Sequence, residues 1–305
     1  MKTVIAGGTG FLGRALADRL LADRHDVVVL TRRAPAPPAR DPRLRVVTWT
    51  PTGGVGPWAA EIDGAGAVVN LAGESIAGKR WSAAHKQRIA ASRLDATRSI
   101  VAAIRAAATP PVVLVSGSAV GYYGPGGDDI ATEDCPPGND FLARVCVQWE
   151  TEAARAATPR TRVALMRTGL VLERDGGALR QMLPPFWIGA GGPVGSGRQF
   201  WPWIHRHDWI ELVRWTIQTA NVSGPINAVA PTPVTNAEFA RTLGRVLRRP
   251  AVMPAPAFAL RLLLGEMADA LLLSGQRAVP ARAERLGFVF QYARLEDALR
   301  SIFKR

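Results

Sequence analysis

Residues 2–24, KTVIAGGTGFLGRALADRLLADR, decide the fold. Residues 2–7 are mostly apolar and predict a buried strand. After them, apolar side chains at positions 11, 12, 15, 16, 20 and 21 fall on one face of a helix. Between the two lies Gly7-x-x-Gly10-x-x-Gly13. Glycine permits a positive φ and a close approach of the backbone to phosphate, while a helix N-terminus offers free N–H groups. This stretch therefore predicts a strand–loop–helix unit that binds a dinucleotide.

The same alternation of apolar runs and helical patterns continues along the first half of the chain. We expect further strands at 26–32, 44–49, 67–73, 111–118 and 161–169, and helices near 82–108 and 139–157. Strands that alternate with helices form parallel sheets with right-handed crossovers. The sequence therefore predicts an α/β fold, a Rossmann-like doubly wound parallel sheet.

The pattern changes beyond about residue 170. A glycine-rich loop at 188–199 precedes a helix at 208–220 with Asp208 as its N-cap, and Thr235 and Glu238 stand at capping-box spacing. The last 50 residues are mostly helical. We expect a cofactor domain at 1–168, completed by about 203–229, and a smaller, mostly helical substrate or lid region at 169–202 and 230–305.

Composition limits the class of protein. The 305 residues carry a formal net charge of +13, and arginine supplies all but four of the 38 basic residues. These arginines are scattered and no recognition motif accompanies them, so we expect no nucleic-acid partner. No apolar run approaches the roughly 20 residues of a membrane span, so we expect no membrane partner. The chain opens directly on a strand and has only two cysteines, which favours a cytoplasmic location.

The end of the second expected strand discriminates between cofactors. An acidic residue there would bind the ribose 2′-hydroxyl of NAD. This chain has Thr31, Arg32 and Arg33 instead. A hydroxyl and guanidinium groups suit a 2′-phosphate, so we expect NADP(H) rather than NAD(H).

Several motifs together resemble one superfamily. GGTGFLG (7–13), NLAG (70–73) and VSGSAVGYYG (115–124) resemble the extended short-chain dehydrogenases/reductases. Further stretches, among them GGPVGSGRQFWPWIH and LLLGEMADALLLSGQRAVP, are similar to NAD-dependent-epimerase-like proteins with an extra helical C-terminal module. The usual description of that family is nucleoside-diphosphate sugar epimerase.

The resemblance implies a set of cofactor-binding residues. Gly7, Thr9, Gly10, Phe11, Leu12 and Gly13 would surround the pyrophosphate. Leu71, Ala72 and Gly73 would pass beside the adenosine and ribose, and Val171 would flank the nicotinamide. Arg93 stands where many relatives have asparagine, and would reach either cofactor phosphate or a structural water.

The catalytic residues of the superfamily are only partly present. Relatives use a serine, and a tyrosine followed four residues later by a lysine that lowers its pKa. Ser118 matches the serine, but in the family register Leu142 and Cys146 take the places of the tyrosine and lysine. No Tyr-x-x-x-Lys pair occurs anywhere in the chain.

Other side chains are candidates to replace the missing pair. Tyr122 or Tyr123 would place a phenol near the nicotinamide, or would only pack at a strand end. His205 ends an apolar run beside the glycine-rich loop. Cys146 would act as a nucleophile or, as is usual for a helix-interior cysteine, fill the core. Three further candidates are Glu74 as a base and Lys79 and Arg80 as a clamp for an anion.

The sequence leaves two functions open. The first is an NADP(H)-dependent epimerase-like enzyme or oxidoreductase acting on a small polar substrate, with Ser118, Tyr122 and His205 as catalytic candidates. The second is a non-enzymatic NADP(H)-binding redox sensor or scaffold. No spacing of histidine, cysteine and acid predicts a metal site. The protein would be a monomer, or a homodimer formed through the helices near 82–108 and 139–157.

Overall fold

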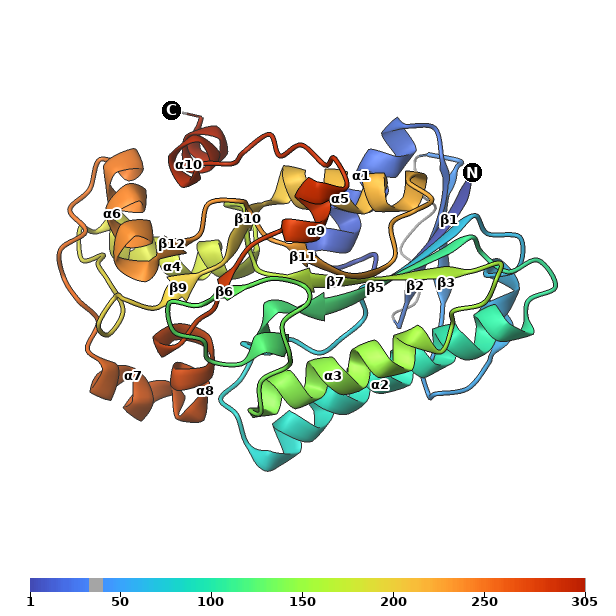
Figure 1. Ribbon diagram of the computed structural model, residues 1–305, viewed down its shortest axis with the longest axis horizontal. Helices are drawn as coiled ribbons and strands as arrows, with labels where there is room; N and C mark the ends of the chain where they lie inside the picture. The colour runs from blue at the N-terminus through green and yellow to red at the C-terminus, as the bar shows by residue number, and fades with distance from the viewer. Residues whose placement is uncertain (33–40, 305) are drawn as a thin grey trace.

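A computed structural model describes residues 1–32 and 41–304. At its centre is a parallel sheet of seven strands in the order β11-β7-β5-β4-β1-β2-β3 (Figure 1). The strands are β1 (Lys2–Ala6), β2 (Asp26–Thr31), β3 (Leu44–Thr48), β4 (Ala67–Asn70), β5 (Val113–Ala119), β7 (Arg162–Thr168) and β11 (Gly224–Ala228). All six pairings within it are parallel. The expected Rossmann-like α/β fold is confirmed.

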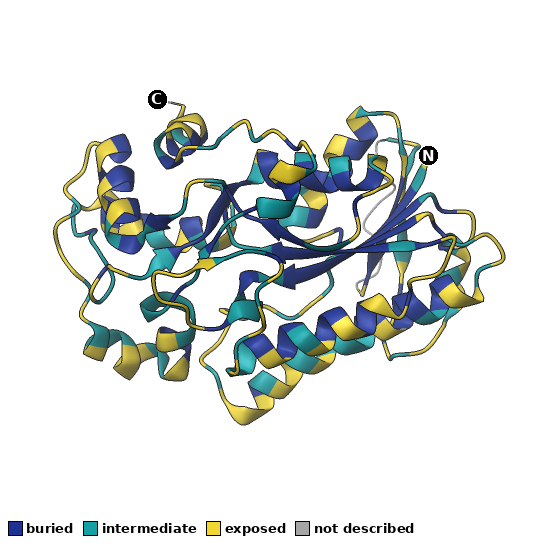
Figure 2. Ribbon diagram, in the orientation of Figure 1, coloured by how far each residue is buried: buried dark blue, intermediate teal, exposed yellow. Residues whose placement is uncertain are grey.

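Helices cover both faces of the sheet, because alternate side chains of each strand point to opposite faces. Ile5 and Val29 pack with α1 (Phe11–Ala22) and α5 (Arg206–Gln218). Val4 and Val28 pack on the other side with α2 (Ala83–Ala106). In Figure 1, α2 and α3 (Phe141–Ala154) lie side by side below the sheet, and α1 and α5 lie above it. Figure 2 shows the central strands almost wholly buried between these layers, whereas the edge strand β3 is partly exposed.

The C-terminal region has a core of its own. It joins α4 (Gly177–Trp187), α6 (Asn236–Leu247) and α10 (Leu295–Phe303) through buried residues that include Leu183, Phe239, Leu243 and Leu299. Thr235 caps α6 by accepting a hydrogen bond from the backbone N–H of Glu238, as its spacing predicts. The division into domains stays a prediction; strand β11 falls within the segment 203–229 that was expected to complete the sheet.

Three short strand pairs join distant parts of the chain. The pairs are β8 (Leu170–Leu172) with β10 (Trp203–His205), β9 (Phe200–Trp201) with β12 (Val234–Thr235), and β6 (Ile130–Ala131) with β13 (Arg277–Ala278). Strands of two or three residues are too short to show a periodicity, so the sequence does not predict them.

Two features of the C-terminal helices differ from expectation. Helix α5 begins at Arg206, two residues early, with His205 and not Asp208 as its N-cap. The run 257–273 is interrupted at Gly265, whose φ of +62° cannot continue a helix, which leaves α7 (Ala257–Leu264), α8 (Glu266–Ala268) and a π-helical turn (Asp269–Leu273). Arg80 lies against Gly265 and occupies the space of a side chain there.

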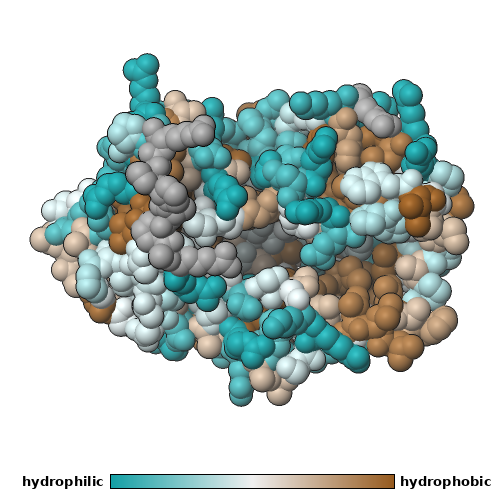
Figure 3. Space-filling view, turned by 180° about the vertical axis from the view of Figure 1, so that it is seen from behind, coloured by the Kyte–Doolittle hydropathy of each residue, from teal (hydrophilic) through white to brown (hydrophobic). Residues whose placement is uncertain are grey.

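The face opposite to that of Figure 1 is hollowed near its centre (Figure 3). Apolar side chains gather beside the hollow, over the region of α7, where Phe258, Leu262 and Leu263 are exposed. No helix within residues 1–32 and 41–304 is both long and apolar enough to cross a membrane.

Candidate functional site

The loop between β1 and α1 is built so closely that side chains are excluded from it. Gly7 has φ +79°, and a Cβ there would lie 2.8 Å from the carbonyl carbon and oxygen of Leu71. A Cβ on Gly13 would lie 2.4 Å from the carbonyl oxygen of Gly7. Gly10 is the N-cap of α1 and supplies no side-chain cap, so the first N–H groups of the helix stay available. The loop can therefore hold a phosphate against backbone N–H groups.

The other expected cofactor residues surround this loop. Thr9 and Gly10 are exposed at its tip, beside Phe11 and Leu12. A Cβ on Gly177 would lie 3.1 Å from the ring of Phe11 and 3.3 Å from the carbonyl oxygen of Val171, so Phe11 and Val171 meet there. The sheet thus brings the phosphate loop, the end of β4 and strand β8 together at the carboxyl ends of its strands, where ligands bind in such folds.

The segment after β4 lies in space between the phosphate loop and Arg93 of α2. It consists of Leu71, Ala72 and Gly73. Leu71 and Ala72 touch Gly7, and a Cβ on Gly73 would lie 3.2 Å from Arg93. Arg93 donates hydrogen bonds from Nη1 to the carbonyl oxygens of Glu74 (3.0 Å) and Ile89 (2.9 Å). Burial lowers the pKa of Arg93, against the opposing influence of Cys146 and Glu74.

Thr31 and Arg32 end β2 at the same edge. Thr31 is buried and Arg32 is exposed. Arg33 lies outside the described residues. The 2′-phosphate contact therefore stays a prediction.

Ser118 belongs to a buried polar network at the end of β5. Its Oγ donates a hydrogen bond of 2.6 Å to Oε1 of Glu150, on α3. Arg167, on β7, grips the same carboxylate with Nε and Nη2, at 2.9 Å to each oxygen. All three side chains are buried. Because an ionised carboxylate only accepts hydrogen bonds, the Ser118 proton points at Glu150.

Tyr123 continues the network towards the C-terminal residues. Its hydroxyl accepts from Nη1 of Arg167 (3.0 Å) and donates to Oδ1 of Asn227 (2.6 Å). Glu133 accepts from the backbone N–H groups of Asn227 (3.0 Å) and Arg282 (3.1 Å). Burial raises the pKa of Tyr123 to about 12. Tyr123 is thus fixed in the interior, with both of its hydrogen-bonding roles used.

Tyr122 is the freer of the two phenols. Its ring lies over the guanidinium of Arg167, whose Cζ is 3.4 Å from the ring centroid, which is a cation–π contact. Its hydroxyl makes no hydrogen bond to any residue within the described ranges. Tyr122 is half-buried, so its hydroxyl stays a candidate proton donor.

The face of α3 that carries the catalytic pair in relatives is apolar here. Leu142 packs on the turn at Gly121. A Cβ on Gly121 would lie 3.4 Å from the Cβ of Leu142. The thiol of Cys146 donates to the carbonyl oxygen of Ala119 at 3.7 Å. Burial raises the pKa of Cys146 to about 11, and Glu150 adds to the rise. A thiol held so firmly in its neutral form is a poor nucleophile, so Cys146 behaves as a core residue.

His205 lies apart from the Ser118 network. Its Nδ1 accepts the backbone N–H of His207 (3.0 Å), and its ring stacks on Tyr292 with centroids 4.0 Å apart. Burial, with His207 and Arg206 nearby, lowers the pKa of His205 to about 4. In this neutral tautomer Nε2 carries the proton, and no described residue accepts it. Nε2 is the atom through which a catalytic role of His205 would act.

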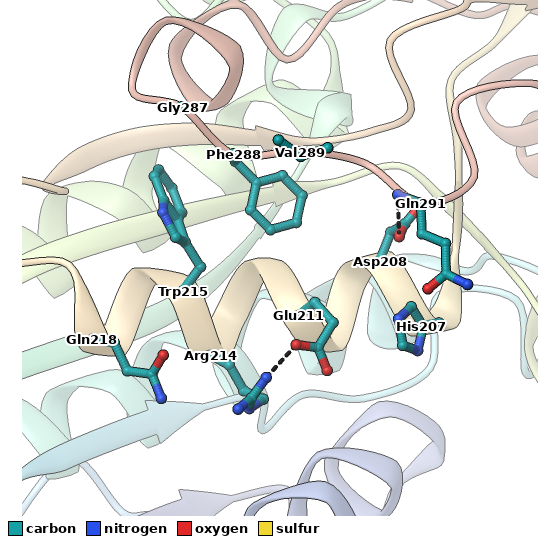
Figure 4. A pocket seen from close by; sticks show the side chains of 10 residues that line it. All are labelled: His207, Asp208, Glu211, Arg214, Trp215, Gln218, Gly287, Phe288, Val289 and Gln291. Carbon is teal, nitrogen blue, oxygen red and sulfur yellow. Dashed lines mark hydrogen bonds and ion pairs between the residues drawn. The ribbon is translucent and has the colours of Figure 1, made fainter.

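Asp208 has a structural role other than the expected cap. Its carboxylate accepts the backbone N–H groups of Gln291 (3.0 Å) and Tyr292 (2.9 Å), which joins α5 to the C-terminal segment. Beside it, Figure 4 shows a groove of about 410 Å³ along the outer side of α5, facing residues 287–291. None of the residues that line this groove belongs to the Ser118 network.

Two other expectations concern groups near the site. Glu74, Lys79 and Arg80 lie in the loop after β4, and the backbone N–H of Glu74 donates to Oγ of Ser92 at 2.9 Å. Within residues 1–32 and 41–304, no group of three or more histidine, cysteine and acidic side chains is placed to hold a metal ion.

Sequence reasoning missed the other buried polar members of the Ser118 network. They are Glu150, Arg167, Glu133 and Asn227, four buried polar side chains. One signal was available: Arg167 is a charged residue inside the otherwise apolar strand VALMRTG. A charge in a central strand needs a buried partner, and Glu150 stands one helical turn beyond Cys146 on the same face of α3.

Comparisons with known proteins agree with this architecture. The model of the NAD dependent epimerase/dehydratase family matches residues 3–229, and a domain of unknown function, DUF1731, matches residues 255–302. The chain belongs to the NAD dependent epimerase/dehydratase family. Among its relatives, the Arabidopsis thaliana "Epimerase family protein SDR39U1 homolog, chloroplastic" is 43% identical over all of this chain and 87% of its own length. The Bacillus subtilis "Epimerase family protein YfhF" is 38% identical, over 98% of this chain and 97% of its own.

A solved structure gives a more particular match. The crystal structure of human epimerase family protein SDR39U1 (isoform 2) with NADPH has a TM-score of 0.91 and 36% identity, and each chain is covered completely. The nucleoside-diphosphate sugar epimerase from Corynebacterium glutamicum, with a TM-score of 0.78 and 34% identity, covers 98% of this chain and 57% of its own.

Proposed function

We propose that the protein binds NADP(H) at the β1–α1 loop and transfers hydride between this cofactor and a small polar substrate. The observation that carries the cofactor assignment is the loop itself, in which Gly7 and Gly13 have no room for a Cβ and the N-terminus of α1 stays open. Pyrophosphate fits against such backbone N–H groups.

The choice of NADP(H) over NAD(H) rests on two supports. Thr31 and Arg32 stand at the end of β2, where an acid would select NAD. The human relative, 36% identical, was crystallised with NADPH. The remaining cofactor residues of the proposal are Gly7, Thr9, Gly10, Phe11, Leu12, Gly13, Leu71, Ala72, Gly73 and Val171. The expected role of Arg93 at the cofactor phosphate stays a prediction.

The proposed chemistry departs from that of the superfamily because Leu142 and Cys146 carry no acid or base. The proton of Ser118 is directed at Glu150, so its Oγ can accept a hydrogen bond from a substrate hydroxyl but cannot donate one to a substrate carbonyl oxygen. Tyr122 is the phenol with a free hydroxyl. We therefore assign the substrate oxygen to Ser118 and Tyr122, and keep His205 as a further candidate through its Nε2. The substrate is a carbonyl compound or a sugar nucleotide.

Fluorescence titrations with NADPH and NADH test the cofactor assignment. Wild type should bind NADPH more tightly than NADH. Arg32→Ala should lose roughly tenfold in NADPH affinity, the value of one charge-assisted hydrogen bond, and little in NADH affinity. Equal binding of the two nucleotides by wild type would refute the choice of NADP(H).

Turnover tests the catalytic assignment. Bound NADPH is followed by fluorescence against a panel of carbonyl compounds and sugar nucleotides. Ser118→Ala and Tyr122→Phe should each lower kcat while NADPH affinity stays within about twofold. Full activity in both variants would refute their assignment.

A second function has its own support. The apolar face of α3 and the fully used hydroxyl of Tyr123 remove the usual proton relay, as a non-enzymatic redox sensor or scaffold would permit. Tight NADPH binding with no oxidation by any member of the panel would favour it. Monomer or homodimer, and a cytoplasmic location, remain predictions; one relative is named chloroplastic.

A further inference from the structure

Three buried or half-buried arginines can be compared directly. Arg167 is paired with Glu150 through Nε and Nη2. Arg162 donates to three carbonyl oxygens, of Val222 (2.8 Å), Thr216 (2.7 Å) and Ile217 (2.9 Å), through both terminal nitrogens. Two of these carbonyls belong to the last turn of α5, where the helix dipole favours a cation. Arg167 is therefore compensated by a carboxylate, and Arg162 has both terminal nitrogens on carbonyl oxygens although its buried Nε lacks a partner.

Arg93 differs from both. It makes no ion pair with any residue in 1–32 or 41–304, and only its Nη1 is hydrogen-bonded, to two carbonyl oxygens. Its Nε and Nη2 have no hydrogen-bonding partner among these residues. Neither atom is fully buried, so both are reachable from solvent. These two atoms form the edge with which Arg167 grips Glu150. That edge matches the two oxygens of a carboxylate.

The surroundings hold Arg93 in place. Its guanidinium lies over the ring of Trp149, with Cζ 5.3 Å from the centroid, and Gly73 lacks the Cβ that would meet it. Burying a cation without an anion is unfavourable, and burial lowers the pKa of Arg93. An anionic ligand bound at this point would compensate the charge of Arg93.

The position of Arg93 places that anion in the proposed substrate site. Gly73, against which it packs, continues the segment that touches Gly7 of the phosphate loop. On its other side is Trp149, which the guanidinium overlies and which packs against Gly117, the residue before Ser118. Arg93 therefore lies between the end of β4 and α3, near the carboxyl end of β5, which carries Ser118.

We propose that the substrate carries a carboxylate, and that Arg93 binds it through Nε and Nη2 beside Ser118. This inference rests on the proposed function and narrows its substrate class. The alternative source of an anion at this point is the phosphate of the cofactor.

Ligand binding to the NADPH-loaded protein tests the proposal without requiring turnover. Pyruvate, oxalate, benzoate and glucuronate are titrated by calorimetry, each against its neutral methyl ester. At least one carboxylate should bind wild type, and its ester should bind at least tenfold more weakly. Arg93→Lys, which keeps the charge but loses the planar edge, and Arg93→Gln should weaken the carboxylate roughly 10- to 100-fold. NADPH affinity should stay within about twofold. Arg105→Gln, an exposed arginine on the same helix, is the matched control and should bind as wild type does.

Each other outcome overturns the carboxylate assignment. Failure of all four acids to bind wild type, equal binding of acid and ester, or unchanged binding by Arg93→Gln would each do so. A tenfold loss of NADPH affinity in Arg93→Gln would assign the charge to the cofactor phosphate instead. Failure of wild type to bind NADPH would refute the proposed function itself, which is a separate result.

Thermal unfolding separates a ligand-binding role from a structural one. Arg93→Met keeps an unbranched stem against Trp149 and removes the buried charge. If Arg93 serves to bind a ligand, its replacement should not destabilise the ligand-free protein. The Tm of the ligand-free variant should therefore not fall below that of wild type. A large fall in Tm would assign Arg93 to the framework of the fold.

Discussion

The phosphate loop and the Ser118 network lie at the same edge of one sheet but are built in opposite ways. The loop is made of backbone: its glycines leave N–H groups open and exclude side chains. The network is made of buried side chains that satisfy one another, from Ser118 through Glu150 and Arg167 to Tyr123. The loop is thus shaped for a ligand, whereas most polar atoms of the network are already occupied. Recognition of the cofactor and stability of the fold are therefore separable, and variants in the two regions should behave differently.

Glu150→Ala should have the largest effect. It leaves the cation of Arg167 buried and unpaired and removes the acceptor of Ser118, at a cost of about 3–5 kcal/mol in the free energy of unfolding. Urea denaturation measures this loss. NADPH affinity should change less than twofold under conditions where the variant is folded. The double variant Glu150→Met with Arg167→Met should recover much of the stability, because it removes both charges of the pair and leaves neither unpaired. No recovery would show that the network contributes more than a compensated charge pair.

Gly13→Ala should show the reverse pattern. Its Cβ would lie 2.4 Å from the carbonyl oxygen of Gly7, so the loop must move. Strain of about 1–3 kcal/mol corresponds to roughly a 10- to 100-fold weaker binding of NADPH, measured by fluorescence titration. Gly54→Ala is the control, because a Cβ there meets nothing within 4 Å. If Gly13→Ala bound NADPH as wild type does, the loop would not be the cofactor site.

A third variant tests the pH dependence of stability. The native pKa of His205 is about 4, below its unfolded value near 6.5. As pH falls through this window the unfolded chain takes up the proton and the native state does not, so the free energy of unfolding falls, by about 1–2 kcal/mol between pH 7 and pH 5. His205→Asn keeps an N-cap acceptor and removes this titration.

The difference between wild type and His205→Asn isolates the histidine. Burial raises the pKa of Asp208, which acts in the opposite direction on the stability of both proteins and so cancels. Urea denaturation at pH 5, 6 and 7 provides the measurement. Parallel pH profiles for the two proteins would show that His205 does not titrate as described.

Substitution of either cysteine should have the smallest effect on stability. The two thiols should instead differ in reactivity. Burial raises the pKa of Cys146 to about 11, whereas Cys135 is only half-buried. Two pKa units above the ordinary value mean about 100-fold less thiolate. In the native protein one thiol should react with a disulfide reagent, and Cys135→Ser should abolish that reaction. Rapid modification of Cys146 would revive its role as a nucleophile.

The sequence predicted the phosphate loop but not the Ser118 network, because the two regions are built differently. The phosphate loop is a local feature: seven consecutive residues, GGTGFLG, determine its shape. The network joins Ser118, Glu133, Glu150, Arg167 and Asn227, which are far apart in the chain, and only the folded sheet brings them together. Six of the seven strands of the sheet were predictable from periodicity, whereas β11 was not identified as a strand and only falls within the segment 203–229 expected to complete the domain. The start of α5 was not, since the capping role depends on the ring of His205, nor was the break at Gly265, where Arg80 packs.

The connection of the network to the C-terminal segment affects how the chain can fold during synthesis. Glu133 needs the N–H of Arg282, and Asp208 needs those of Gln291 and Tyr292. Domains generally fold as they emerge from the ribosome, beginning at the N-terminus. Here the nascent sheet retains unsatisfied buried carboxylates until almost the last residue has been made. We therefore expect the fold to be completed only after synthesis, and a chain that stops before residue 277 to lack these hydrogen bonds.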